Sequence, residues 1–230
     1  MNTVRPAHEP HRIMTDDELT GSPLRTTALI ATGDLHLSPS LPPVPITVSH
    51  LTGTDARNGR LTPQLAALLV GAYSAPGDTI VSVGADPALA GAAGAGGRIY
   101  LSVRDPHQLN QLEHVAGKLA MVVVSWPPAA DPAADADGAA ALFLSCRRLM
   151  RRNGCTIVAI SQLPAGDTYR QHSAVLLPAA QQAGLAWQQH VVAFAGRAAP
   201  RANTDPAEHV AEPVAIHVDL LVFSVRGHGD

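Results

Sequence analysis

The sequence predicts a doubly wound α/β fold, in which a mostly parallel sheet ends in an antiparallel hairpin. Three observations predict it. From residue 61 onward, short apolar runs alternate with segments of helical pattern. The runs are continuous rather than alternating, which is typical of parallel strands covered on both faces. The last two extended segments, residues 185–195 and 214–225, are joined by a polar loop without a helical pattern, which favours an antiparallel pair at the sheet edge.

The composition limits the possible functions. Of the 230 residues, 46% are hydrophobic and only 3% aromatic, so the core must be built from aliphatic side chains. The formal net charge is −3 and Lys118 is the only lysine, which argues against a domain dedicated to nucleic-acid phosphates. Two cysteines exclude a disulfide scaffold and a four-thiolate zinc site. No secretory or membrane-spanning segment is visible, so we expect a protein of the bacterial cytoplasm.

Three regions divide the chain. Residues 1–22 mix Pro, His, Asp and Glu without periodicity and are predicted to be a disordered leader. Residues 23–60 are an N-terminal extension with short apolar runs at 26–32 and 46–51, the second of which is a candidate edge strand. Residues 61–230 are the predicted domain.

The first half of the domain begins with a predicted helix over residues 62–73, because Thr62 can cap it and Pro63 suits the first helical position. The pattern continues with a strand over 79–83, a helix over 85–95, a strand over 98–103, a helix over 106–117 and a strand over 119–125. The last of these, LAMVVVS, is the most strand-like stretch of the chain because of its run of valines.

The second half continues the alternation. A helix is predicted over residues 138–152, with Leu142, Cys146 and Leu149 on one stripe, and Asn153-Gly154 is expected to end it. A strand over 155–160 follows, then a helix over 170–183 that Gly184 stops, and then the two extended segments of the hairpin.

Several motifs lie in this frame. Pro76-Gly77-Asp78 precedes the first strand of the domain, and Gly97-Arg98 precedes the second. Further along the chain come MVVVSWPPAAD, RRNGCTIVAI and HSAVLLPAAQQAGLAWQQHVVAFAGR. With these motifs, residues 61–101 and 119–197 resemble the S-adenosylmethionine-dependent DNA amino-methyltransferases, which modify adenine N6 or cytosine N4. The resemblance implies a Rossmann-like methyltransferase sheet with S-adenosylmethionine as its cofactor.

The resemblance also implies a cofactor site. In the family, the first strand ends in an acidic residue and a glycine-rich loop that lets the backbone approach the cofactor. These positions fall at Ser82, Gly84 and Asp86, and the family's loop glycines are replaced. The family's second strand ends in an acidic residue that accepts the ribose hydroxyls. Only Asp105, one place after Arg104, could fill that role here, so the resemblance implies a degraded cofactor site.

The catalytic segment implied by the resemblance is altered too. The family uses a side-chain oxygen and a proline carbonyl to accept the target amine, and an aromatic ring to stack on the flipped base. The corresponding residues here are Ser125, Trp126, Pro127 and Pro128, with Ala129 in the aromatic place. Trp126 stands at the polar position, and Ser125 is displaced by one residue. The resemblance therefore implies a pseudoenzyme, a degenerate relative of a DNA methylase.

The domain is also short. Between Arg104 and Lys118 there is room for one helix, where the family places a further strand and helix. So few residues, roughly fifteen, cannot form a base-reading domain. Specific reading of DNA would require the N-terminal segment or a partner.

Simpler structural interpretations stay open beside these roles. Gly84 and Asp86 could form an ordinary turn in which Asp86 caps the next helix. The segment from Trp126 to Pro128 could be a rigid loop. His190 and His217 are interpreted as structural histidines. No metal site is expected, because the histidines show no HxH or HExxH spacing.

A basic stripe is predicted on the helix over residues 138–152. It comprises Arg147, Arg148, Arg151 and Arg152. Cations near a helix C-terminus are favoured by the helix dipole, which supports a solvated structural role. The alternative is that the stripe faces phosphate or an acidic partner.

Two functional hypotheses follow from these observations. In the first, the chain is a non-catalytic methyltransferase relative that works as a binding or regulatory module, with a protein partner or as a homodimer and with weak nucleic-acid binding. In the second, it is an active S-adenosylmethionine-dependent methyltransferase acting on a nucleic-acid amino group. A doubly wound domain for another nucleotide is disfavoured, because the sequence has no GxGxxG or GxxxxGK[ST] motif.

Overall fold

The computed structural model describes residues 44–52, 61–128, 135–160, 169–196 and 216–225, so the predicted leader and the apolar run at 26–32 lie outside it. The strands within these ranges are β1 (Ile46–Thr52), β2 (Thr79–Val83), β3 (Ile99–Val103), β4 (Leu119–Trp126), β5 (Met150–Ile160), β6 (Leu185–Gly196) and β7 (Ile216–Val225). The helices are α1 (Pro63–Tyr73), α2 (Pro87–Ala95), the 3-10 helix η2 (Pro106–Val115), α3 (Ala136–Leu149) and α4 (Tyr169–Gln182).

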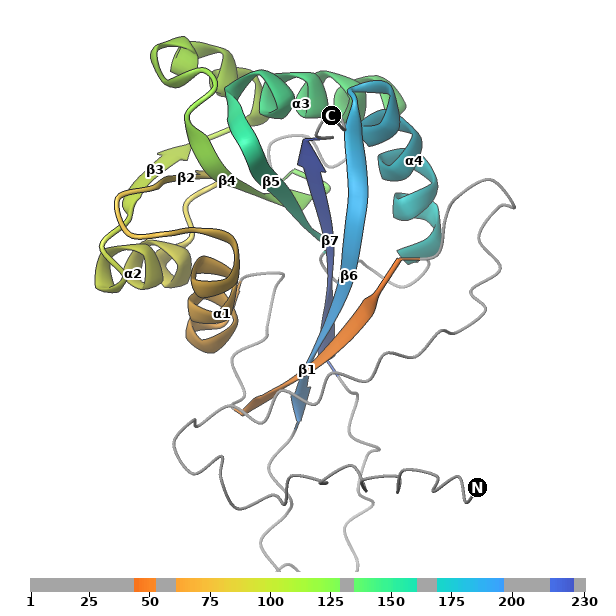
Figure 1. Ribbon diagram of the computed structural model, residues 1–230. Helices are drawn as coiled ribbons and strands as arrows, with labels where there is room; N and C mark the ends of the chain where they lie inside the picture. The colour runs from red at the N-terminus through yellow and green to blue at the C-terminus, as the bar shows by residue number, and fades with distance from the viewer. Residues whose placement is uncertain (1–43, 53–60, 129–134, 161–168, 197–215, 226–230) are drawn as a thin grey trace, which may run out of the picture.

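All the described strands belong to one sheet, in the order β1-β6-β7-β5-β4-β2-β3 (Figure 1). β3, β2, β4 and β5 are parallel to one another, and β7 runs antiparallel to both of its neighbours. The predicted fold class, a mostly parallel α/β sheet with an antiparallel terminal hairpin, is confirmed. The hairpin does not form the sheet edge, however, because β1 pairs with β6 in parallel and takes that place.

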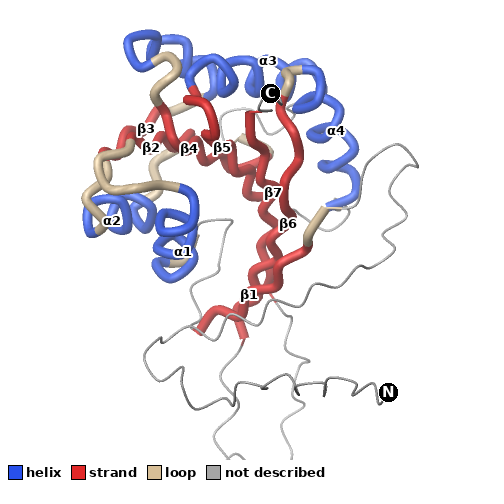
Figure 2. Tube along the Cα trace, in the orientation of Figure 1, coloured by secondary structure: helices blue, strands red, loops and turns tan. Residues whose placement is uncertain are grey.

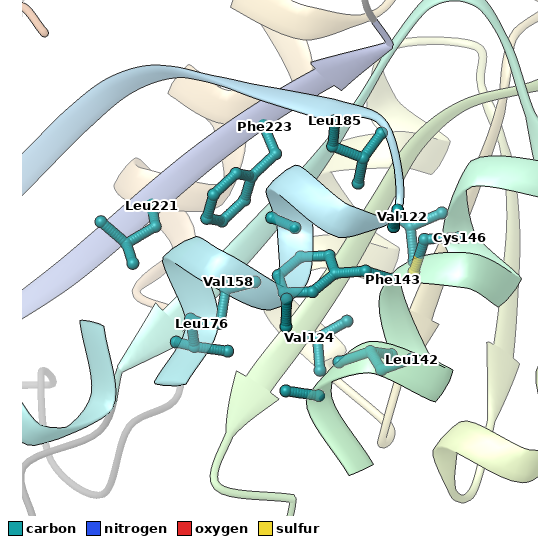
Figure 3. Close-up of a cluster of buried hydrophobic side chains, with 14 of the residues drawn as sticks. Val122, Val124, Leu142, Phe143, Cys146, Val158, Leu176, Leu185, Leu221 and Phe223 are labelled. Atoms are coloured by element: carbon teal, nitrogen blue, oxygen red, sulfur yellow. The ribbon is translucent and has the colours of Figure 1, made fainter. Parts of the chain in front are cut away.

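Helices cover both faces of the sheet (Figure 2). α1 and α2 pack on one face, and η2, α3 and α4 pack on the other. On the second face, Phe143 of α3 meets Phe223 of β7 edge-on, with ring centroids 5.0 Å apart (Figure 3). Because both faces are covered, the central strands need apolar side chains in both directions, which explains their continuous apolar runs.

Four of the described helices, α1, α2, η2 and α3, begin with side-chain caps. Thr62 accepts the N–H of Leu65 at 3.2 Å, as the Thr-Pro signal predicts. Asp86, Asp105 and Asp135 do the same for α2, η2 and α3. Each cap satisfies a backbone donor that has no partner inside the helix. Three of the four caps are therefore aspartates.

The end of α3 differs from the prediction. The helix ends at Leu149 and β5 begins at Met150, so Asn153-Gly154 lies inside the strand. The pairing of β4 with β5 shifts here, from Leu119 opposite Met150 to Met121 opposite Cys155. Asn153 has a φ of 66°, a left-handed conformation that Asn tolerates better than most residues. The Asn-Gly signal therefore marks an irregularity within a strand and not the end of a helix.

Between β3 and β4 the chain forms η2 and no further strand. The expectation of room for one helix is confirmed, but the helix is of the tighter 3-10 type, with a kink at Leu112. The sheet consequently ends at β3 on this side. β1, from the N-terminal extension, is the edge strand on the other side, and the domain boundary at residue 61 stays a prediction.

Candidate functional site

The carboxyl ends of β2, β3 and β4 meet at one edge of the sheet. From β2 the chain moves outward to β3, and it then returns to place β4 on the other side of β2. This reversal is the topological switch point at which open α/β sheets bind ligands. The residues that follow these strands, Gly84, Asp105 and Pro127, are therefore the natural ligand-facing positions.

A pocket lies beside this edge, between η2, α3 and the end of β4. Its volume is about 200 Å³. It is lined by Asp105, Pro106, His107, Asn110, Trp126, Pro128, Gly138, Ala141, Leu142 and Ser145. Among the sequence-predicted site residues, the structure thus brings Asp105 together with Trp126 and Pro128. Ser82, Gly84, Asp86, Ser125 and Pro127 do not line this pocket.

The β2–α2 loop is held together by internal hydrogen bonds. The hydroxyl of Ser82 is buried and lies 2.6 Å from both the Gly84 carbonyl oxygen and the Tyr100 hydroxyl. Tyr100 also accepts the backbone N–H of Asp86, at 3.2 Å. Gly84 has a φ of +87°, which favours glycine. The sequence motifs do not point to Tyr100, because its contact with this loop depends on the pairing of β3 with β2.

The side chain of Asp86 also makes hydrogen bonds within the protein. Its carboxylate accepts the N–H of Leu89 at 2.9 Å and that of Leu61 at 3.4 Å. The first bond caps α2 and the second ties α2 to the start of the domain. The capping interpretation of Asp86 is confirmed, and a cofactor role stays a prediction.

Asp105 both caps a helix and lines the pocket. It accepts the N–H of Gln108 at 3.2 Å, which caps η2, and it lines the pocket. Its neighbour Arg104 is exposed, and the Arg104 N–H donates to the side chain of Gln108 at 2.7 Å. A carboxylate has about four lone-pair sites, so a capping Asp105 can still accept from a ligand.

Trp126 is among the most buried large side chains described. Only 1% of it is exposed, and its indole N–H donates to Nδ1 of His172 on α4 at 3.1 Å. The bond between Trp126 and Pro127 is a cis peptide, and Ser125 is exposed at the preceding position. His172 is not evident in the sequence, because it follows Trp126 by 46 residues.

A buried polar group lies beyond Trp126, under the start of α4. Nε2 of His190 and Oδ1 of Asp219 are 2.8 Å apart, and the Tyr169 ring stacks on the His190 ring at 4.7 Å. Burial, and secondly the Asp219 carboxylate, raise the pKa of the Tyr169 hydroxyl well above its usual range. His190, which the sequence indicates to be structural, therefore contacts both Asp219 and Tyr169. The side chain of His217 lies outside the described residues.

The prediction of a basic stripe on one helix is wrong. Arg147 and Arg148 lie in the last turn of α3, but Arg151 and Arg152 lie on β5. Arg148 pairs with Glu113 at 3.1 Å, and Arg151 pairs with Asp78 at 2.8 Å. The four arginines therefore do not form one helix face, because the helix ends between the two pairs.

Within the described ranges, no group of three or more His, Cys, Asp or Glu side chains could hold a metal ion. None of the helices described is long and apolar enough to cross a membrane. Burial raises the pKa of the Cys146 and Cys155 thiols to about 12, so both are neutral at pH 7 and poor nucleophiles.

No protein-family model matches the sequence, and no curated protein is similar to it. Solved structures with a partial likeness include the antibiotic-resistance methyltransferase Kmr, with 18% identity, 78% of this chain and 88% of that chain covered, and a TM-score of 0.39. Another is a TehB-like SAM-dependent methyltransferase from Corynebacterium glutamicum, with 12% identity, coverage of 70% and 87%, and a TM-score of 0.39. A third is geranyl diphosphate methyltransferase in complex with SAM, with 13% identity, coverage of 72% and 85%, and a TM-score of 0.41. The fold class of this chain rests on its own strand order.

Proposed function

We propose that the protein is a non-catalytic relative of the S-adenosylmethionine-dependent DNA amino-methyltransferases that acts as a binding or regulatory module. The observation that carries the proposal is Trp126. It stands at the polar catalytic position of the family, yet its ring is buried and its only N–H donor is used by His172. An indole has no acceptor for the N–H groups of a target amine, so this position cannot do the family's chemistry.

The fit of S-adenosylmethionine supports the same proposal. Pockets for drug-sized ligands usually have volumes of about 300–1,000 Å³. The pocket beside Asp105 has about 200 Å³, and Ser82 and Asp86, which make internal hydrogen bonds, do not line it. The pocket beside Asp105 alone would therefore hold only part of the cofactor. Its lining includes one carboxylate, from Asp105, which suits a smaller ligand or one part of the cofactor.

Calorimetric titration with S-adenosylmethionine and with S-adenosylhomocysteine tests the proposal. We expect no binding of either at micromolar concentrations. The variant Ala141→Leu fills the pocket from α3 and should abolish any binding there. Micromolar binding of both compounds that is lost in this variant would contradict the proposal. Ala136→Leu is the matched control, because Ala136 is also exposed on α3 but does not line the pocket.

The second candidate is an active S-adenosylmethionine-dependent methyltransferase acting on a nucleic-acid amino group. One observation favours it: Asp105 lines the same pocket as Trp126 and Pro128, so the expected ribose acceptor and the expected target loop are adjacent. Transfer of a labelled methyl group from S-adenosylmethionine to DNA or RNA, lost in Asp105→Ala, would establish it. No transfer at millimolar cofactor would exclude it.

The proposal includes a protein partner or a second copy of the chain, and only weak nucleic-acid binding. Ile99 and Leu144 are 55% and 58% exposed, the two large hydrophobic side chains most open to solvent in the described part. Weak DNA binding is supported by the pairing of Arg148 and Arg151 with acidic residues. Fluorescence anisotropy should show affinity for duplex DNA that falls steeply with salt. A salt-insensitive nanomolar affinity would contradict this part.

A further inference from the structure

A row of side chains crosses the sheet at the carboxyl ends of β4 and β5. Trp126 of β4 lies opposite Ile160 of β5, and Ile160 lies opposite Asp219 of β7. Partners in register point to the same face of a sheet, and this face is the one that α3 and α4 cover. The row therefore leads from the pocket beside Asp105 to a second carboxylate, which does not line that pocket.

Polar side chains from three elements lie at the far end of this row. Nε2 of His190 on β6 is 2.8 Å from Oδ1 of Asp219, and the Tyr169 ring on α4 stacks on the His190 ring with centroids 4.7 Å apart. His190 is only 5% exposed. One turn further along α4, Nδ1 of His172 accepts the indole N–H of Trp126. The first turn of α4 thus places two polar side chains over the row.

Buried polar atoms without a partner are concentrated in this group. Of the four buried side-chain nitrogen and oxygen atoms that lack a hydrogen-bond partner in the described ranges, three belong to it. They are Nδ1 of His190, Oη of Tyr169 and Nε2 of His172. Most buried polar groups in proteins are hydrogen-bonded, and each one without a partner destabilises the fold. Three under one helical turn are the pattern expected of a binding site whose ligand supplies the partners.

The hydrogen bonds that these side chains already make decide what each unpartnered atom can do. An ionised carboxylate only accepts, so Nε2 of His190 carries the proton that Asp219 accepts, and Nδ1 of the neutral ring is an acceptor. Nδ1 of His172 accepts the indole N–H, so the proton of that ring is on Nε2, which is a donor. The Tyr169 hydroxyl can donate and accept. The three atoms therefore match a ligand group that both donates and accepts.

Charge narrows the class of ligand. An anion would be repelled by the Asp219 carboxylate, and a cation offers no acceptor for the Nε2 proton of His172. A metal ion does not suit the site either, because the described side chains contain no group of three or more His, Cys, Asp or Glu that could hold one. A neutral carboxamide remains suitable. Its donor and its acceptor are on separate atoms, so it can reach side chains of two elements at once.

We propose that the Tyr169 hydroxyl and the ring nitrogens of His172 and His190 form a binding site for a neutral primary carboxamide group. The carboxamide NH2 donates to Nδ1 of His190, and its oxygen accepts from Nε2 of His172 and from the Tyr169 hydroxyl. This site is separate from the pocket beside Asp105, because none of its three residues lines that pocket. It therefore goes beyond the proposed function and does not depend on it.

Removal of the Tyr169 hydroxyl tests whether it lacks a partner in the protein without a ligand. Tyr169→Phe keeps the ring that stacks on His190 and eliminates only the unpartnered oxygen, so the midpoint of thermal unfolding should rise by about 2–4 °C. Tyr73→Phe is the matched control. The Tyr73 hydroxyl donates to Oε1 of Gln189 at 2.6 Å, so its removal should lower the midpoint. A fall in both variants would show that the Tyr169 hydroxyl already has a partner, such as an ordered water, and would overturn the site.

Acetamide is the probe for the ligand class, and nuclear magnetic resonance of the two indole N–H groups follows its binding in the natural sequence. The Trp126 N–H is bonded to His172, whereas the Trp187 N–H donates to the backbone carbonyl of Gln189 at 3.1 Å. We expect acetamide to shift the Trp126 signal in a saturable way and to leave the Trp187 signal in place. Acetate and methylammonium, which have a similar size, should shift neither. The proposal is overturned if acetamide shifts neither signal, or if either ion shifts the Trp126 signal as acetamide does.

Variants locate the acetamide. Tyr169→Phe should weaken its binding about two- to tenfold, the effect of one hydrogen bond, and Tyr73→Phe should leave it unchanged. Ala141→Leu fills the pocket beside Asp105, so the shift of the Trp126 signal should persist in that variant. Equal affinity in Tyr169→Phe, or a shift lost in Ala141→Leu, would overturn the site. Titration with S-adenosylhomocysteine tests the other pocket, so either result there leaves these outcomes interpretable.

Discussion

At the scale of single residues, the carboxyl edge of the sheet is occupied by side chains that complete the fold. Asp86 caps α2, Asp105 caps η2, and Ser82 bonds to the Gly84 carbonyl oxygen and to Tyr100. The sequence locates these positions, because each is at or just after the end of a predicted strand. It could not distinguish a cap from a ligand contact, since that depends on partner atoms such as the Leu89 N–H.

Removal of the α2 cap should have a measurable cost. Asp86→Ala eliminates the acceptor of the Leu89 N–H. Loss of an N-cap to alanine costs about 0.5–2 kcal/mol, so the free energy of unfolding in urea should fall by about 1 kcal/mol. Asp86→Asn keeps a capping oxygen and should change little. Equal losses in the two variants would show that the carboxylate charge matters more than the cap.

Two buried thiols and a half-buried phenol predict a loss of stability in alkali. Burial raises the pKa of Cys146 and Cys155 from 9.0 to about 12, and that of Tyr73 from 10.0 to about 12. Between about pH 9 and 12 the folded state therefore binds more protons than the unfolded state, so the free energy of unfolding falls as the pH rises. Below this window both states keep these protons and the groups add no pH dependence.

Urea unfolding at about pH 8 and about pH 10.5 measures this effect. We expect a lower free energy of unfolding at the higher pH, and a smaller difference in Cys155→Ala, which removes one of the thiols. A free energy that stays constant or rises between the two values would show that these groups are not buried as described.

At the scale of elements, apolar periodicity locates the strands of the core well. The predicted strand over residues 79–83 coincides with β2, and the strand over 119–125 is one residue shorter than β4. Periodicity fails at the end of α3, where residues 150–152 continue the helical pattern but belong to β5, with Met150 opposite Leu119 of β4. It also cannot distinguish η2 from an α-helix, because both place residues three apart on one side.

Two glycines should respond in opposite ways to alanine. A Cβ on Gly154 would lie 2.8 Å from the Leu119 carbonyl oxygen and 3.0 Å from that of Arg151, so Gly154→Ala forces backbone apart and should destabilise the fold. Gly91 is in the middle of α2, where a Cβ would meet nothing within 4 Å. Gly91→Ala should therefore raise the free energy of unfolding by about 0.5–1 kcal/mol.

Thermal unfolding followed by circular dichroism compares the two variants with the natural sequence. The midpoint should fall for Gly154→Ala and rise for Gly91→Ala. A Gly154→Ala protein as stable as the natural one would mean that β5 does not approach β4 at this irregularity.

At the scale of the whole molecule, the sequence predicts the layers and the direction of most strands, because helices alternate with buried strands. It does not predict that β1 pairs with β6, because the two strands are far apart in the sequence. In the structure Ile46 lies opposite His190. The same limit applies to the site. Asp105, Trp126 and Pro128 are predicted, but the contact with His172 depends on how α4 crosses the sheet.

The central claim is that Trp126 is buried at the family's target position and that the pocket beside Asp105 holds at most part of a methyltransferase cofactor. A crystal structure of the protein with millimolar S-adenosylhomocysteine tests it most directly. We expect Trp126 to remain buried against His172, with any bound density confined to the pocket between Asp105 and Ala141. Density for the complete cofactor, extending from Gly84 to Asp105 along the carboxyl ends of β2 and β3, would contradict the claim.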